Sequence, residues 1–247
     1  THPLLEVNFS SQAHTISGTG SLLFLHVNSD NQVNVGTVSF INLDVDNTIA
    51  NSGTITVTGA FSGGGTMTNA ATGIFIWQGT SVANKVIDAS IPGNTIRLIN
   101  NTVANLDIGD FVTANTYHHL TLSGTNEFRT GGDMDINGDL TIQSGAVLNN
   151  APLNKLINIG GNWTNNNGAG GFLNGTNAIT FDGTSPQSIY TSTGNEVFAN
   201  LVINNTSATG VTITLGEVHV TSSLTLTDGI VFTSATNLLV LEDGATS

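Results

Sequence analysis

Four side chains that can bind a metal ion occupy alternate positions in the segment GGDMDINGDLTIQSG, residues 131–145: Asp133, Asp135, Asn137 and Asp139. With Gly138 among them, they follow the spacing with which a calcium-binding loop of the D-x-D-x-N-G kind begins. A helix–loop–helix calcium site also needs a bidentate Glu at the twelfth loop position, and Ser144 stands there instead. We therefore expect surface decoration and no cofactor, and we keep calcium binding as the alternative.

An internal copy of this segment argues for the same conclusion. Residues 134–150 align with residues 218–234 at an offset of 84, and Asp139 corresponds there to Ser223. The second copy therefore keeps the alternation of apolar and polar residues but lacks the potential ligands. Because successive side chains of a strand point to opposite faces, the apolar residues should face the core and the acids should face solvent. The residues expected to face the core are Met134, Ile136, Leu140 and Ile142.

The histidines show no spacing that would let them share a metal ion. His118 and His119 are adjacent, so on a strand they point to opposite faces. The other histidines are isolated in the sequence: His2, His14, His26 and His219. A zinc site would need ligands from several parts of the fold. We therefore expect the histidines to have structural or surface roles.

Residue patterns typical of enzymes are weak. Asp44 and Asp46 in NLDVDN share one face of a predicted strand, whereas hydrolysis of a glycoside needs two carboxylates that face one cleft. The basic residues that a lyase would use are scattered: Lys85, Arg97, Arg129 and Lys155. The serine motif G-x-S-x-G is absent. We expect no enzyme, with a carbohydrate-binding or polysaccharide-processing β-helix as the alternative.

Aromatic, threonine and asparagine residues allow two further binding functions. Four aromatic residues could form a platform for stacking against sugars: Trp77, Tyr117, Trp163 and Tyr190. Trp77 aligns with Phe181 in an internal copy, which favours core packing. Regularly spaced threonines such as Thr54, Thr56 and Thr58 would suit an ice-binding face. Outward rows of Asn are expected instead to form side-chain ladders that also satisfy turn backbone.

Charge and apolar content exclude several classes of partner. Asp and Glu outnumber Lys and Arg by 17 to 4, so nucleic acid is a poor partner, because neutralising phosphates requires clustered basic residues. Among the longest apolar runs is SLLFLHV, far short of the roughly 18 residues that span a membrane, so we expect no direct membrane insertion. The chain has no Cys, which excludes disulfides and thiolate metal sites.

Short segments with alternating apolar and polar residues predict β-strands throughout the chain. Examples are TITVTG (54–59), HLTLSG (119–124) and SLTLTDG (223–229), in which apolar residues alternate with Thr or Ser and Gly ends the run. A period of two with Gly or Asn at the end of each run indicates half-buried strands. No segment carries apolar residues at the spacing of an amphipathic helix, so we predict an all-β fold.

Internal copies predict how these strands are arranged. YHHLTLSG aligns with FANLVINN at an offset of 81, whereas GIFIWQGT aligns with NAITFDGT at an offset of 104. The two offsets differ by 104 − 81 = 23 residues. This is the size of one repeat, because Leu120 and Leu140 are 20 residues apart and Leu201 and Leu224 are 23 residues apart. A solenoid tolerates the insertion of such a block because each coil contacts only its neighbours. We predict a parallel, right-handed β-helix of about 10–12 coils, with tandem antiparallel β-sandwich domains as the alternative.

The segment GNWTNNNGAGGFLNGTNAITFDGTSPQSIYTSTGNEVFANLVINN, residues 161–205, resembles the Asn-, Gly- and Thr-rich repeats of large secreted surface proteins of Bacteroidetes bacteria. GTITVTGAFSGGGTMTNAATG, residues 53–73, resembles them as well. The resemblance covers roughly residues 50 to 247 and is poor over residues 1–18. It implies export through the type IX route, display at the cell surface, and a filamentous or adhesive role. It implies no catalytic residue.

These observations together predict the organisation and role of the chain. We expect N-terminal coils or a cap over residues 1–50, continuous with a solenoid repeat region over residues 51–247. The expected function is a non-catalytic structural and adhesive segment of a larger bacterial cell-surface or extracellular filament protein. The expected partners are flanking domains of the same polypeptide or other copies end to end, and surface glycans. An ice-binding solenoid is the second alternative.

Overall fold

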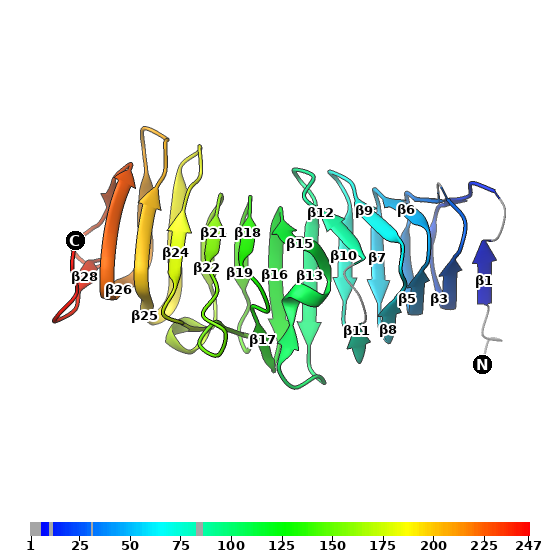
Figure 1. Ribbon diagram of the computed structural model, residues 1–247, viewed down its shortest axis with the longest axis horizontal. Coiled ribbons are helices and arrows are strands. Elements are labelled where there is room, and N and C mark those ends of the chain that lie inside the picture. The colour runs from blue at the N-terminus through cyan, green and yellow to red at the C-terminus, as the bar shows by residue number, and fades with distance from the viewer. Residues whose placement is uncertain (1–5, 10–11, 31, 83–85) are drawn as a thin grey trace.

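The chain forms a solenoid of parallel β-strands with about 11 turns, seen here in a computed structural model that describes residues 6–9, 12–30, 32–82 and 86–247. The strands cross the long axis of the molecule, and β1 (Glu6–Phe9) and β28 (Leu239–Leu241) lie at opposite ends (Figure 1). Every strand pairing among the described residues that the register defines is parallel. The predicted β-solenoid is therefore confirmed, and the alternative of antiparallel β-sandwich domains is wrong.

Each coil carries strands on three faces, which we name the first, second and third face in chain order. The first face holds β3 (Thr19–Val27), β5 (Thr37–Val45), β7 (Thr54–Val57), β10 (Ile74–Trp77), β13 (Thr95–Asn100), β16 (His119–Gly124), β19 (Leu140–Ile142), β22 (Trp163–Asn165) and β27 (Val231–Phe232). The later halves of β3 and β5 continue onto the second face, where β5 also pairs with β8.

The second face adds β1, β8 (Ala60–Ser62), β11 (Ser81–Val82), β14 (Leu106–Asp107), β17 (Glu127–Arg129), β20 (Val147–Asn149), β23 (Phe172–Leu173) and β28. The third face holds β2 (Thr15–Ile16), β4 (Gln32–Asn34), β6 (Thr48–Asn51), β9 (Thr66–Asn69), β12 (Ile87–Ala89), β15 (Val112–Tyr117), β18 (Met134–Ile136), β21 (Ile157–Ile159) and β24 (Ala178–Phe181). Near the C-terminal end, β25 (Gln187–Asn204) and β26 (Val211–Asp228) each run through all three faces. Two 3-10 turns, η1 (Ile108–Asp110) and η2 (Gly168–Gly170), lie in the connections.

The strand register matches the spacing of the sequence repeats. Leu120 pairs with Leu140, and Leu201 pairs with Leu224, so the coil lengths predicted from these two pairs are confirmed. Other coils differ in length: the coil from Thr37 to its partner Thr54 is shorter, and the coil from Trp163 to its partner Ile189 is longer. The extra or missing residues of these coils lie in the corners, because the strands must stay in register while the connections between them can vary in length.

Alternation of side chains places one continuous apolar core inside the coils. Met134, Ile136, Leu140 and Ile142 are all buried, as their shared parity predicts. The corners between faces are tight. At Gly63 the backbone has a φ of +125°, and a Cβ atom there would lie 2.0 Å from the carbonyl oxygen of Val45 in the preceding coil. Glycine is needed at such a corner because only it combines this conformation with so close an approach.

The three-faced coil continues across residue 50, where the sequence suggested a change of region. β5 pairs with β7 and β6 pairs with β9, so coils on either side of this position share the same strand columns. No helix in the described part of the chain is long and apolar enough to span a membrane.

Candidate functional site

The acidic motif at residues 133–139 is spread over the outer surface of the third face and its corner. Asp133 Oδ1 accepts a hydrogen bond from the backbone N–H of Leu156 at 3.0 Å. Asp139 Oδ1 accepts from the backbone N–H and the side-chain amide of Asn162, at 2.7 Å and 2.9 Å. The two acids therefore hold the next coil in place through these bonds.

The motif also fails to gather its carboxylates. Among the described residues, one group of three His, Cys, Asp or Glu side chains brings its ligand atoms within 4.8 Å of one another, and it consists of His26, Asp44 and Asp46. The aspartates of the motif do not form such a group. Calcium binding at the motif, with Asn137 as a further ligand, stays an untested alternative that this geometry does not favour.

The adjacent histidines differ in their contacts. His119 Nδ1 accepts from the backbone N–H of Asp139 at 3.0 Å, and its ring lies edge-on to that of His118 with centroids 4.2 Å apart. Burial, followed by the neighbouring His119, lowers the pKa of His118. His219 contacts Glu217 through Nε2 at 3.0 Å and Glu242 through Nδ1, so its two carboxylates lie on opposite edges of the ring. That arrangement raises the pKa of His219 against the effect of its own partial burial.

Three of the four aromatic side chains considered for a sugar-stacking platform pack inside the coils, and the fourth, Tyr190, is partly exposed. Trp77, Trp163 and Tyr117 are fully buried, which confirms the predicted core role and removes them from any sugar-stacking surface. Trp77 packs edge-on against Phe111 with ring centroids 5.2 Å apart. The hydroxyl of Tyr117 donates a 2.6 Å hydrogen bond to the carbonyl of Ile108.

The outward threonines do not form an unbroken lattice. In the row that contains Thr56, the next two coils carry Ile76 and Arg97. In the row that contains Thr54, the next coil carries Ile74. An ice-binding face requires a flat, regular repeat, so these interruptions weigh against that alternative.

Asparagines form a ladder, but it lies inside the solenoid and not on its outer surface. Asn34, Asn51 and Asn69 end successive strands of the third face and are completely buried. The amide of Asn34 donates to Asn51 Oδ1 at 2.8 Å, and the amide of Asn51 donates to Asn69 Oδ1 at 2.8 Å. Asn51 also donates to the carbonyl of Ile74 at 3.1 Å. The expected laddering is confirmed, while the expected outward position is wrong, because corner backbone turned inward needs polar partners.

A carboxylic acid is buried at the corner between the first and second faces. Glu196 is 1% exposed, and its Oε2 accepts three hydrogen bonds. The donors are Trp163 Nε1 at 3.0 Å, Asn165 Nδ2 at 2.9 Å and Thr191 Oγ1 at 2.8 Å. Burial raises the pKa of Glu196 from 4.5 to about 7, and these three hydrogen bonds oppose that rise. No sequence pattern singled out this residue, because Asn195 and Glu196 resemble an ordinary polar turn.

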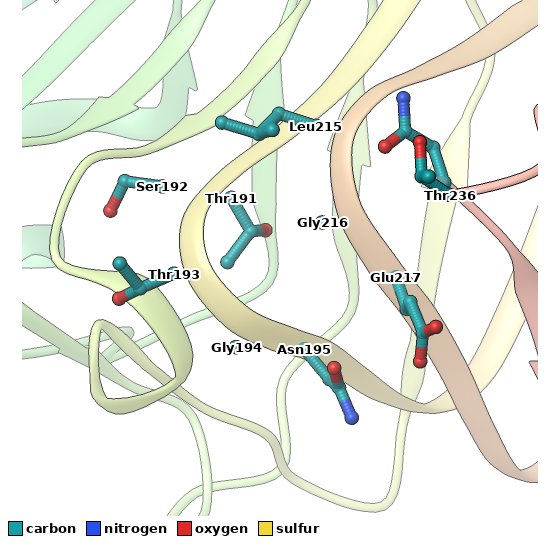
Figure 2. A pocket seen from close by; sticks show the side chains of 10 residues that line it. Thr191, Ser192, Thr193, Gly194, Asn195, Leu215, Gly216, Glu217 and Thr236 are labelled. Atoms are coloured by element: carbon teal, nitrogen blue, oxygen red, sulfur yellow. The ribbon is translucent and has the colours of Figure 1, made fainter.

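An open pocket of about 420 Å³ lies directly outside this corner (Figure 2). Asn195 of β25 and Glu217 of β26 are paired neighbours that line it, together with Thr191. The lining offers hydroxyl, amide and carboxylate groups but no aromatic ring. The pocket can therefore hydrogen-bond a polar ligand, and it lacks the stacking surface typical of a sugar site.

A second pocket, of about 300 Å³, is lined by two carboxylic acids. Asp107 and Asp110 line it. Asp107 Oδ1 accepts from the backbone N–H of Gly109 at 2.8 Å and so caps η1, which gives this acid a structural task. The sequence did not single out these residues, because Asp107 ends the two-residue strand β14 and Asp110 lies in the 3-10 turn that follows, so they do not share one strand face.

The C-terminal coil leaves its apolar interior open. Leu226 pairs with the fully buried Ile203 and yet is 56% exposed. Leu241 pairs with the fully buried Val220 and is 39% exposed. Both belong to inward-facing rows, and they are exposed because no described coil lies beyond them. β28 and the end of β26 form this edge (Figure 1).

Comparisons with protein-family models, with curated proteins and with solved structures found no match for this chain.

Proposed function

We propose that this chain is a structural and adhesive segment of a larger bacterial cell-surface or extracellular filament protein, without a catalytic role. The observation that carries the proposal is a rod of about 11 coils that remains in parallel register and exposes an apolar interior at its C-terminal end. Continuous backbone hydrogen bonding between coils gives stiffness, because each coil is fixed by its neighbours.

The open end supports the proposed partner. An exposed strand edge with apolar side chains in the inward rows is a template for another parallel coil. Such a coil would cover Leu226 and Leu241 as the strands that carry these two residues cover Ile203 and Val220. It would come from a flanking part of the same polypeptide or from a second copy stacked end to end.

The role of a stiff rod is tested by small-angle X-ray scattering on the full chain. The expected result is an elongated particle with the axial ratio of a stack of about 11 coils. A compact particle of low axial ratio would contradict the proposal.

The partner is tested by placing a charge on the open end. If copies stack, Leu226→Asp should weaken self-association in sedimentation velocity at least tenfold, because a carboxylate would replace an apolar contact between coils. Leu153→Asp is the matched control, since Leu153 is 43% exposed but lies in a corner away from the open end. An elongated wild-type monomer at all concentrations would exclude stacked copies as the partner of this end. Association unchanged in Leu226→Asp would contradict the role of this end.

A further inference from the structure

Three potential metal ligands meet on the outer surface near the N-terminal end of the solenoid. His26 and Asp44 are directly paired across β3 and β5, and Asp46 follows shortly after Asp44 in the chain. The distance from His26 Nε2 to Asp46 Oδ2 is 2.9 Å, and that to Asp44 Oδ2 is 3.8 Å. Two ligand atoms bound to one tetrahedral zinc ion lie roughly 3.3 Å apart. The observed separations bracket this value, so small movements of the side chains would admit an ion.

The next coil fixes the carboxylates in this orientation. Ser62 Oγ donates to Asp44 Oδ1 at 2.8 Å, and the backbone N–H of Gly64 donates toward Asp46 Oδ1 at 3.3 Å. Each aspartate is thus held through Oδ1 and presents Oδ2 to the histidine. Contacts that orient the ligands from outside are typical of metal sites.

The charge at this position also suits a cation. Two carboxylates approach the same imidazole nitrogen, Nε2 of His26. The side chains are partly exposed, at 25% for His26 and 27% for Asp44, which leaves space for water to complete the coordination. No Lys or Arg is among the described ion-pair partners of these three residues.

We propose that His26, Asp44 and Asp46 bind a divalent transition-metal ion, with zinc as the best fit, and that the ion joins two successive coils. An imidazole nitrogen with two carboxylate oxygens is a ligand set that zinc and manganese accept. Calcium is disfavoured because it requires six to eight oxygen ligands. The ion would bridge β3 and β5, so it would tie together the N-terminal coils. Binding of the metal ion at this cluster does not depend on the structural and adhesive role proposed above.

A second histidine with two acids provides a matched control. His219 contacts Glu217 through Nε2 and Glu242 through Nδ1, so the two carboxylates cannot share one ion with a single ring nitrogen. At His26 both carboxylates approach Nε2. Only the cluster at His26 should therefore bind the metal, although both histidines are flanked by two acids.

The test is calorimetric titration of zinc, manganese and calcium chloride into the full chain. We expect one zinc ion per chain, bound at least tenfold more weakly by His26→Gln and by Asp44→Asn. His219→Gln and Asp135→Asn should retain the wild-type affinity, and circular dichroism should confirm that all variants are folded. Absence of zinc binding, equal loss in His219→Gln, or unchanged binding in His26→Gln would overturn the proposal. Tighter binding of calcium than of zinc at this cluster would overturn the assigned metal class.

Discussion

Glu196 is expected to contribute about 3 kcal/mol less to stability above about pH 7 than below about pH 4.5, and Glu196→Gln is expected to remove this difference. The pKa of Glu196 is raised in the folded chain, so folding favours the protonated acid. Its contribution is complete below the ordinary pKa of 4.5 and is lost as pH rises through about 7. Above that range the buried, ionised carboxylate has no cationic partner among its three hydrogen-bond donors.

Glutamine suits this test because it keeps the shape and stays uncharged. Its carbonyl oxygen can still accept from Trp163, Asn165 and Thr191. The measurement is urea unfolding at a series of pH values from 4 to 8, with the difference between wild type and variant isolating the one group. Asp243→Asn, at an exposed carboxylate, should follow the wild-type profile. If Glu196→Gln and wild type fall in parallel with pH, the buried acid does not control stability.

Removing the central member of the asparagine ladder is expected to destabilise the chain by about 3 kcal/mol. Asn51→Ala deletes the acceptor for Asn34 and the donor to both Asn69 and the carbonyl of Ile74. Each buried polar group left without a partner costs about 1–3 kcal/mol, and the small Ala side chain cannot replace the lost bonds.

The ladder is tested by urea unfolding of Asn51→Ala beside Asn101→Ala. Asn101 is exposed, so its replacement should change the free energy of unfolding by less than about 0.5 kcal/mol. Hydrogen exchange should locate the added opening in the coils around β6. Equal effects of the two substitutions would show that the buried ladder contributes no more than a surface asparagine.

Strand alternation and repeat spacing were enough to predict the solenoid and its inward-facing side chains. Alternation in a strand has a period of two, so Met134, Ile136, Leu140 and Ile142 could be assigned to the core from their parity alone. The number of residues in one coil can also be read from the sequence, because the chain must return to the same face before its next strand can pair with the strand of the preceding coil. The distance from Leu120 to Leu140 therefore predicted an observed pairing.

The contacts between polar side chains of different coils could not be predicted from these patterns, because they depend on how the coils stack. Asn51 and Asn69 share the strand parity of the buried Ile49 and Met67, which points them inward, and the stacking of the coils then brings them within hydrogen-bonding distance of each other. The buried Glu196 accepts hydrogen bonds from three side chains. Two of these donors, Trp163 and Asn165, belong to the preceding coil and are distant in sequence. His26 meets Asp44 and Asp46 because the length of the coil between them places Asp44 directly beside His26. Such clusters depend on how many residues each corner holds, and that number varies from coil to coil without changing the strand pattern.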